Sequence, residues 1–453
     1  MRSRTSHTSE TAKTDSQQIT GYRLVIAGLT AFLSFSMGLS MFAVGPIMPL
    51  IIADYGVSNS TASLLTSITF FVHVVFAIPA SMLVGRMGLK TLLWAGATMG
   101  SVPILSFMAT NSFPLLLTLR AVNGASLILV FPAIAPLFMQ WFPPKELPLV
   151  NGVFVATGSL GIAASTFLVA PLSETIGWEM VLSGFGGVSF LSAILWLFFG
   201  KAQRVSMQSE TRSLMMRMGR SEPISNLILD RASSMGRVWR AIRARNTLLV
   251  AIADAGPLAL LTAALAWLPT FYHEVHGMSL PKGGALMGLL SLAGLVALVS
   301  ASLLATRIRR RRPFLVIPGI LTGFAGFASL LLPDSIPLYI AIAALGFACW
   351  FYLPTLLTVP MELYPDNPRQ VSIVFATLMS VGGIASAIAP LTVGAIADLT
   401  RSFVPGLGIF AVLAWSLAVA GRLLPETGLA WVDTEVSRRK DNARSLSRKV
   451  SGN

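Results

Sequence analysis

The chain contains twelve apolar runs, each long enough to cross a lipid bilayer. A transmembrane helix needs about 20 mainly apolar residues, because each residue adds about 1.5 Å and the hydrocarbon core is about 30 Å thick. Turn-forming and charged residues separate the runs, as at Asp54–Gly56 and Pro143–Lys145. The sequence therefore predicts an all-α membrane protein. The expected spans are residues 24–49, 60–84, 91–110, 114–138, 147–172, 180–199, 247–272, 283–306, 313–332, 336–360, 371–396 and 403–421.

The charge content agrees with this prediction. Only 11% of the residues are charged, whereas soluble globular proteins have about 25%. Mean hydropathy is +0.73. The single cysteine, Cys349, excludes an internal disulfide.

The basic residues predict the orientation in the membrane. With both termini in the cytoplasm, 30 of the 33 Lys and Arg residues fall on the cytoplasmic side, Lys282 and Arg401 fall outside, and Arg120 lies within a span. Cytoplasmic loops carry such an excess of positive charge. We therefore expect a multi-pass protein of the plasma (inner) membrane with both termini cytoplasmic. The net charge of +14 follows from this topology, so no nucleic-acid partner is expected.

The spans fall into two sets of six. We expect N-terminal and C-terminal six-helix bundles at residues 23–200 and 247–424, joined by a basic cytoplasmic linker at 201–246. The linker should lie on the anionic inner leaflet. Residues 1–22 are polar and lack the apolar core of a signal peptide, so they are predicted to be a disordered cytosolic tail. A second cytosolic tail is expected at 425–453.

The two halves repeat each other at a nearly constant offset. Six spans per half make the repeats parallel, which suits two bundles that rock around a central path. The matching pairs are Pro49 with Pro269, Gly56 with Gly277, Ser58 with Ser279, Arg86 with Arg307, Gly124 with Gly346, Pro132 with Pro354, Phe142 with Tyr364 and Pro143 with Pro365.

This organisation resembles the major facilitator superfamily over residues 20–425. The loop SMLVGRMGLK (81–90) keeps Arg86, Gly88 and Lys90 of a family motif but has Ser81 and Gly85 in place of its glycine and aspartate. The fourth span keeps the family's R-x-x-x-G pattern at Arg120 and Gly124. The resemblance implies a transporter with alternating access, lined by the first, fourth, seventh and tenth spans and gated at Arg86, Gly88 and Lys90. The segments WFP (141–143) and LPTFY…GMS (268–279) look like the anion-carrying branches.

Arg120 is the strongest candidate for a substrate contact. A charged group at the middle of a span costs about 2.5–3.5 kcal/mol on insertion scales, so it must face a cavity or a partner. Its five donors would suit an oxyanion, with Asn123 beside them. The alternative is an arginine whose donors bind helix carbonyls and Asn123.

His73 and Asp254 are the other polar candidates inside spans. His73 lies near the middle of the second span, where an imidazole can donate to an anion or carry a proton, or bind a neighbouring helix. Asp254 is the only acid within any predicted span. It is a candidate proton-coupling group, unless the membrane begins later and Asp254 caps the helix near Arg245.

Aromatic residues supply the remaining candidates. Phe35, Trp350 and Tyr352 lie at central depths and could line the path, and Trp267 could close it from outside; ordinary packing is the alternative. His273 and His276 flank Glu274, but HEVH lacks the spacing of a helical zinc motif, so no metal site is expected.

These features favour a secondary active transporter over an enzyme. The chain lacks a phosphate-binding G-x-x-x-x-G-K-[ST] sequence, and its few polar groups within spans do not form a catalytic cluster. The expected substrate is a small organic or inorganic anion, moved by a monomer without cofactors and coupled to protons if Asp254 binds one. The alternatives are a proton-coupled multidrug or metabolite exporter and a transporter-like membrane sensor.

Overall fold

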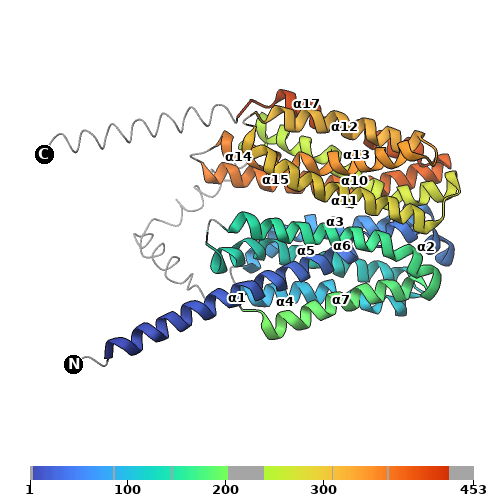
Figure 1. Cartoon of the computed structure of the whole chain (residues 1–453). Coiled ribbons are helices and arrows are strands. Elements are labelled where there is room, and N and C mark those ends of the chain that lie inside the picture. The colour runs from blue at the N-terminus through green and yellow to red at the C-terminus, as the bar shows by residue number, and fades with distance from the viewer. Residues whose placement is uncertain are drawn as a thin grey trace, which may run out of the picture. The chain divides into compact units, whose positions relative to one another are not determined.

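The computed structural model describes residues 4–84, 87–143, 146–201, 239–308, 310–364 and 367–427 (Figure 1). Every regular element within these ranges is a helix. Arg86, residues 202–238 of the linker and the tail from residue 428 onward lie outside the described residues. The elements are α1 (Arg4–Met41), the 3-10 helix η1 (Gly45–Ile47), α2 (Met48–Tyr55), α3 (Asn59–Val84), α4 (Leu89–Gly100), the 3-10 helix η2 (Val102–Ala109), α5 (Phe113–Trp141), α6 (Leu147–Ile176), α7 (Trp178–Phe199), α10 (Arg245–His276), α11 (Leu280–Arg307), α12 (Arg312–Leu331), α13 (Ile336–Phe351), α14 (Leu353–Leu363), α15 (Pro368–Thr400), α16 (Val404–Leu413) and α17 (Ser416–Leu423).

The prediction of twelve spans is confirmed. Twelve helical stretches in the described part of the chain have the length and composition to cross a membrane, and each overlaps one predicted span. The tail differs from the prediction, because α1 begins at Arg4 and makes residues 4–21 helical where we expected disorder. The stretch 4–20 contains neither glycine nor proline, so nothing in it interrupts a helix.

The helices form two compact units. Unit 1 combines the chain up to Glu222 with Leu265–Leu292, and unit 2 combines Pro223–Ala264 with the chain from Ala293 onward. The chain therefore passes from one unit to the other inside the predicted linker 201–246, and again within α10 and within α11. Within unit 1, a Cβ atom at Gly45 would lie 2.0 Å from the Leu265 carbonyl oxygen. Such backbone-to-backbone contact is typical of small residues between membrane helices.

Each unit has a buried apolar core. In unit 1, large side chains from α1, α4, α5 and α7 meet, among them Leu33, Leu92, Phe138 and Trp196, all at most 1% exposed. In unit 2, α10, α14, α15 and α17 contribute Val250, Leu356, Leu378 and Leu417, all 0% exposed.

The internal repeat is visible in the backbone. Gly56 after α2 and Gly277 after α10 are left-handed, with φ of 60° and 61°, at matching positions of the two halves. The Tyr22 hydroxyl at the start of the first span donates to the Phe199 carbonyl at the end of the sixth. In the second half, Arg245 donates to the Leu423 carbonyl and joins the seventh span to the twelfth in the same way.

Four of the spans in the described part of the chain are not one continuous α-helix. The third passes from α4 through Ser101 into the 3-10 helix η2, and the twelfth is broken at Ala414 and Trp415, between α16 and α17. The other two are the first and the tenth. The first span leaves the α-helix after Met41 and resumes through η1 into α2, next to Pro46 and Pro49. The tenth span is interrupted at Tyr352, which separates α13 from α14 and precedes Pro354. Proline removes a backbone donor and clashes with the preceding turn, which explains both positions. Discontinuous membrane helices often mark binding sites.

Candidate functional site

Arg120 binds main-chain carbonyls at the end of α1, where the first span is interrupted. The residue lies on α5, is 3% exposed, and uses four of its five donors. Its Nε donates to the Leu65 carbonyl (3.1 Å), and the two terminal nitrogens donate to the carbonyls of Ser40 (2.6 Å) and Met41 (2.8 Å) and to Asn123 Oδ1 (3.5 Å). The structural alternative for Arg120 predicts contacts of this kind, with main-chain carbonyls and Asn123.

The position of Arg120 has a clear electrostatic basis. The last carbonyls of an α-helix have no partner within the helix, and the helix dipole places partial negative charge there. Because α1 ends inside the protein at Met41, these carbonyls need a buried donor. Arg120 supplies it, and Asn123 is fixed in turn by donating to the Gly100 carbonyl (3.1 Å).

His73 keeps a free hydrogen-bonding atom. Its ring lies edge-on to Phe131 of α5, which packs edge-on against Phe154 of α6. The Nδ1 atom is buried and has no hydrogen-bond partner among the described residues. A buried polar atom without a partner costs about 1–3 kcal/mol, so this nitrogen can accept or donate to a bound solute.

Asp254 and Tyr352 form a buried polar pair in unit 2. Asp254 lies on α10 and is 4% exposed, and Tyr352 is 2% exposed. The Tyr352 hydroxyl donates to Asp254 Oδ1 at 2.9 Å. The cap alternative for Asp254 does not fit, because α10 begins nine residues earlier at Arg245.

The second carboxylate oxygen of Asp254 lies against Gly382 on α15. A Cβ atom at Gly382 would lie 2.8 Å from Asp254 Oδ2, so only glycine leaves the carboxylate its present position. The thiol of buried Cys349 lies 3.8 Å from the Pro257 carbonyl oxygen of α10. Nothing in the sequence connects Asp254 with Tyr352, which lies 98 residues away. Pro354, which follows the interruption, was the available signal that Tyr352 occupies a special position.

The other predicted residues have these surroundings in the structure. Phe35 is half-buried and packs its carbonyl against Gly161, and Trp350 packs on Gly294. Trp267 is 0% exposed. Of the residues predicted to gate the path, Gly88 is the exposed N-cap of α4 and Lys90 is half-buried in its first turn.

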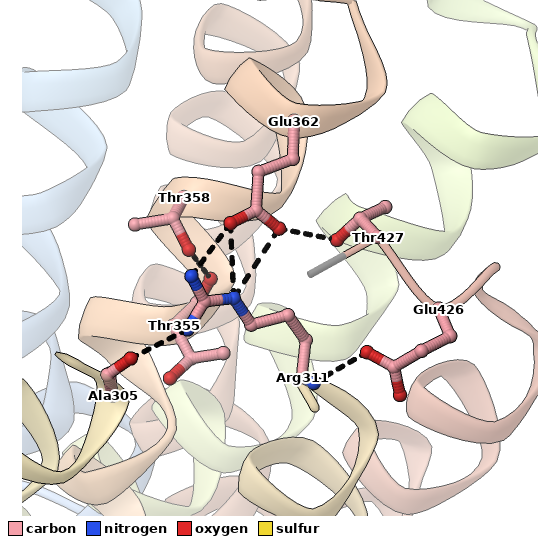
Figure 2. Close-up of polar contacts among 7 residues, drawn as sticks. All are labelled: Ala305, Arg311, Thr355, Thr358, Glu362, Glu426 and Thr427. Carbon is pink, nitrogen blue, oxygen red and sulfur yellow. Dashed lines mark hydrogen bonds and ion pairs between the residues drawn. The ribbon is translucent and has the colours of Figure 1, made fainter. Parts of the chain in front are cut away.

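A second polar cluster in unit 2, which was not predicted from the sequence, joins Arg311, Glu362, Glu426 and Thr427 (Figure 2). Arg311 forms a two-pronged ion pair with Glu362 of α14, with contacts of 2.7–3.3 Å. The Thr427 hydroxyl donates to Glu362 Oε2 (2.5 Å). Glu426 accepts from the backbone N–H groups of Arg311 (2.5 Å) and Arg312 (3.2 Å), so it caps the start of α12.

The described residues contain no group of three His, Cys, Asp or Glu side chains that could hold a metal ion. His273 instead pairs its Nδ1 with the Met278 carbonyl at 2.8 Å.

Comparison with known proteins identifies the family. Residues 30–390 match the Major Facilitator Superfamily. The chain also matches a crystal structure of a bacterial homolog of the human lysosomal transporter Spinster, in an inward-facing conformation, with a TM-score of 0.66 and 16% identity over 91% of this chain and 94% of that one. The chain belongs to the Major Facilitator Superfamily and has its fold of twelve helices in two parallel repeats.

The chain also has sequence relatives. An uncharacterized Campylobacter jejuni protein is 27% identical over 57% of this chain and 73% of its own length. The probable nitrate transporter NarT of Staphylococcus carnosus is 26% identical over 38% of this chain. The chloroplastic sodium-dependent phosphate transport protein 1 of Arabidopsis thaliana is 26% identical over 58%. The matches to these last two span 45% and 50% of their lengths, about half of each.

Proposed function

We propose that the protein is a secondary active transporter that moves a small anion by alternating access and couples this movement to protons at Asp254. The observation that carries the proposal is the buried Asp254–Tyr352 pair. An acid within a span is costly and is usually retained for a function such as proton binding. The pair also joins the seventh span to an interruption of the tenth, which are two of the spans expected to line the path.

Relatives support the anionic substrate. The nitrate and phosphate proteins suggest an inorganic anion, although each match covers only about half of that relative. On this proposal His73 contacts the solute, because its Nδ1 is available while most Arg120 donors bind carbonyls. Arg120 then shapes the interrupted first span beside the path.

An exporter of metabolites or drugs is the second candidate. The observation that favours it is that main-chain carbonyls bind three of the Arg120 donors, so this arginine is largely occupied by the protein itself. Such an exporter would use the same acid at Asp254.

Transport by reconstituted protein tests the proposal. Full-length protein in liposomes should accumulate nitrate or inorganic phosphate against a gradient when a proton gradient is imposed. Asp254→Asn should abolish this uphill accumulation and leave exchange of labelled anion largely intact, because exchange need not release the proton. Proton-driven accumulation by Asp254→Asn at the wild-type level would refute coupling at Asp254.

A control separates the anion carrier from its alternatives. His73→Ala should weaken anion binding without changing coupling, since the histidine lies in the other unit. If neither anion is exchanged and a cationic drug dissipates the proton gradient instead, the exporter is correct. A transporter-like sensor would exchange none of these solutes.

A further inference from the structure

The Asp254–Tyr352 pair is closed to solvent in this structure. With exposures of 4% and 2%, neither side chain can exchange a proton directly with water. If Asp254 binds a coupling proton, as proposed above, a route must connect it to one end of the bundle.

Polar side chains of α14 run from Tyr352 toward the ion pair at its far end. Thr355 is 0% exposed, and its hydroxyl has no hydrogen-bond partner among the described residues. Thr358, one turn further, donates to the Thr355 carbonyl at 2.8 Å. Glu362 follows and binds Arg311, and Figure 2 shows both threonines on the same helix as Glu362. From Tyr352 to Glu362 the helix rises about 15 Å at 1.5 Å per residue.

The corresponding positions of the first half lack this series of hydroxyl and carboxylate groups. Gly124 with Gly346 and Phe142 with Tyr364 fix the offset at 222 on both sides of this segment. The residues that correspond to Tyr352, Thr355, Thr358 and Glu362 are Val130, Ala133, Pro136 and Gln140. The first span likewise carries no acid between residues 24 and 53. Because both halves share the fold, packing alone does not require these polar groups on α14.

We propose that Tyr352, Thr355 and Thr358 form the proton route between Asp254 and the end of unit 2 at Glu362. The inference rests on the proposed coupling role of Asp254. A proton taken up by the Glu362 carboxylate passes along hydroxyls bridged by water. At each oxygen one O–H bond forms and another breaks. Glu362 returns to its carboxylate, the hydroxyls end neutral, and Asp254 ends as a carboxylic acid.

Other ionisable groups lie around this route. Cys349 packs on α10 beside Asp254, Arg311 holds Glu362, and Glu426 caps α12 nearby. A competing route would follow α10, where Thr247 is 0% exposed and its hydroxyl has no partner among the described residues.

Infrared difference spectroscopy after a pH jump tests the route without a substrate. Full-length protein in lipid nanodiscs should gain a carboxylic-acid band on acidification, and Asp254→Asn should lack it. Thr355→Val should slow the appearance of the band roughly tenfold, which corresponds to about 1.4 kcal/mol in the barrier, without changing its final size. Thr355→Ser, which keeps the hydroxyl, should restore the wild-type rate.

The controls make each outcome decisive. Thr322→Val removes an equally buried hydroxyl that bonds within α12 and should leave the rate unchanged. A wild-type rate in both Thr355→Val and Thr358→Val overturns the route, as does slowing by Thr247→Val alone. If Thr355→Val does not remain monodisperse, Thr358→Val decides in its place. If Asp254→Asn keeps the band, the coupling proposal fails, independently of the threonines.

Discussion

The Arg120 guanidinium donates a 2.6 Å hydrogen bond to the main-chain carbonyl of Ser40, where the first span leaves the α-helix. Arg120→Ala should therefore lower the free energy of unfolding by roughly 3 kcal/mol or more, since each buried carbonyl left without a donor costs about 1–3 kcal/mol. Arg120→Lys keeps the charge but loses the planar fork, so its stability should lie between that of the wild type and that of Arg120→Ala. Thermal unfolding of monodisperse protein measures both effects.

Ser40→Ala is the matched control for this prediction. The acceptor is a main-chain oxygen, and the Ser40 hydroxyl has no partner among the described residues. Ser40→Ala should therefore unfold like the wild type. Wild-type stability in Arg120→Ala, together with lost solute binding, would return Arg120 to the substrate role.

Tyr352 and Asp254 should be energetically coupled. Tyr352→Phe removes the hydroxyl that donates to Asp254 Oδ1 at 2.9 Å. In a double-mutant cycle with Asp254→Asn, residues in one hydrogen-bond network show coupling of about 0.5–3 kcal/mol. Tyr352→Phe combined with Thr322→Val should be additive within about 0.5 kcal/mol. If the stability effects of Tyr352→Phe and Asp254→Asn are also additive, the hydrogen bond between the two side chains is contradicted.

Gly382→Ala should disturb the Asp254 carboxylate. The added Cβ atom would lie 2.8 Å from Asp254 Oδ2 and 3.2 Å from Leu258 Cδ2, so the carboxylate must move. We expect reduced proton-driven accumulation by correctly folded protein in the liposome assay. The control is Gly408→Ala, whose Cβ atom would meet Phe327 at 3.7 Å, an ordinary contact. Equal transport by the two variants would show that the carboxylate tolerates displacement.

The Arg311–Glu362 ion pair should stabilise unit 2 more than Arg23–Glu146 stabilises unit 1. Side-chain exposures are 17% and 11% for the first pair and 22% and 44% for the second. We expect Glu362→Gln to cost roughly 2 kcal/mol, between the values for exposed and fully buried pairs. Glu146→Gln should cost less than about 1 kcal/mol. Unfolding midpoints at low and high salt measure both, and equal losses would contradict this ranking.

The sequence predicted the number of spans and the repeat, because the lengths of the apolar runs and the nearly constant offset between matching residues can be read from the residue order alone. It did not predict the interruptions of the first and tenth spans, since the residues around Phe42–Val44 and Tyr352 remain apolar and do not lower the hydropathy. Pro46 and Pro354 were the available signals. They follow the interruptions closely in the chain.

The contacts of the polar residues were harder to predict from the sequence. Arg120, His73 and Asp254 stood out because ionisable groups are rare in spans. Their partners are far away in sequence: Tyr352 is 98 residues from Asp254, and Ser40 is 80 residues from Arg120. A main-chain carbonyl at a helix end has no sequence signature at all, so the binding of Arg120 to carbonyls could be stated only as an alternative.

The cap that Glu426 places on α12 has a consequence for biosynthesis. Arg311 and Glu426 are separated by 115 residues, whereas Arg311 and Glu362 are separated by 51. At a synthesis rate of roughly 5–20 residues per second, the start of α12 waits about 6–23 s for its cap after Arg311 is made. During that time its amide groups are held only by water and lipid headgroups at the edge of the bilayer. Nascent chains that stop before Glu426 should therefore remain targets for membrane quality-control proteases even when all twelve helices have been inserted.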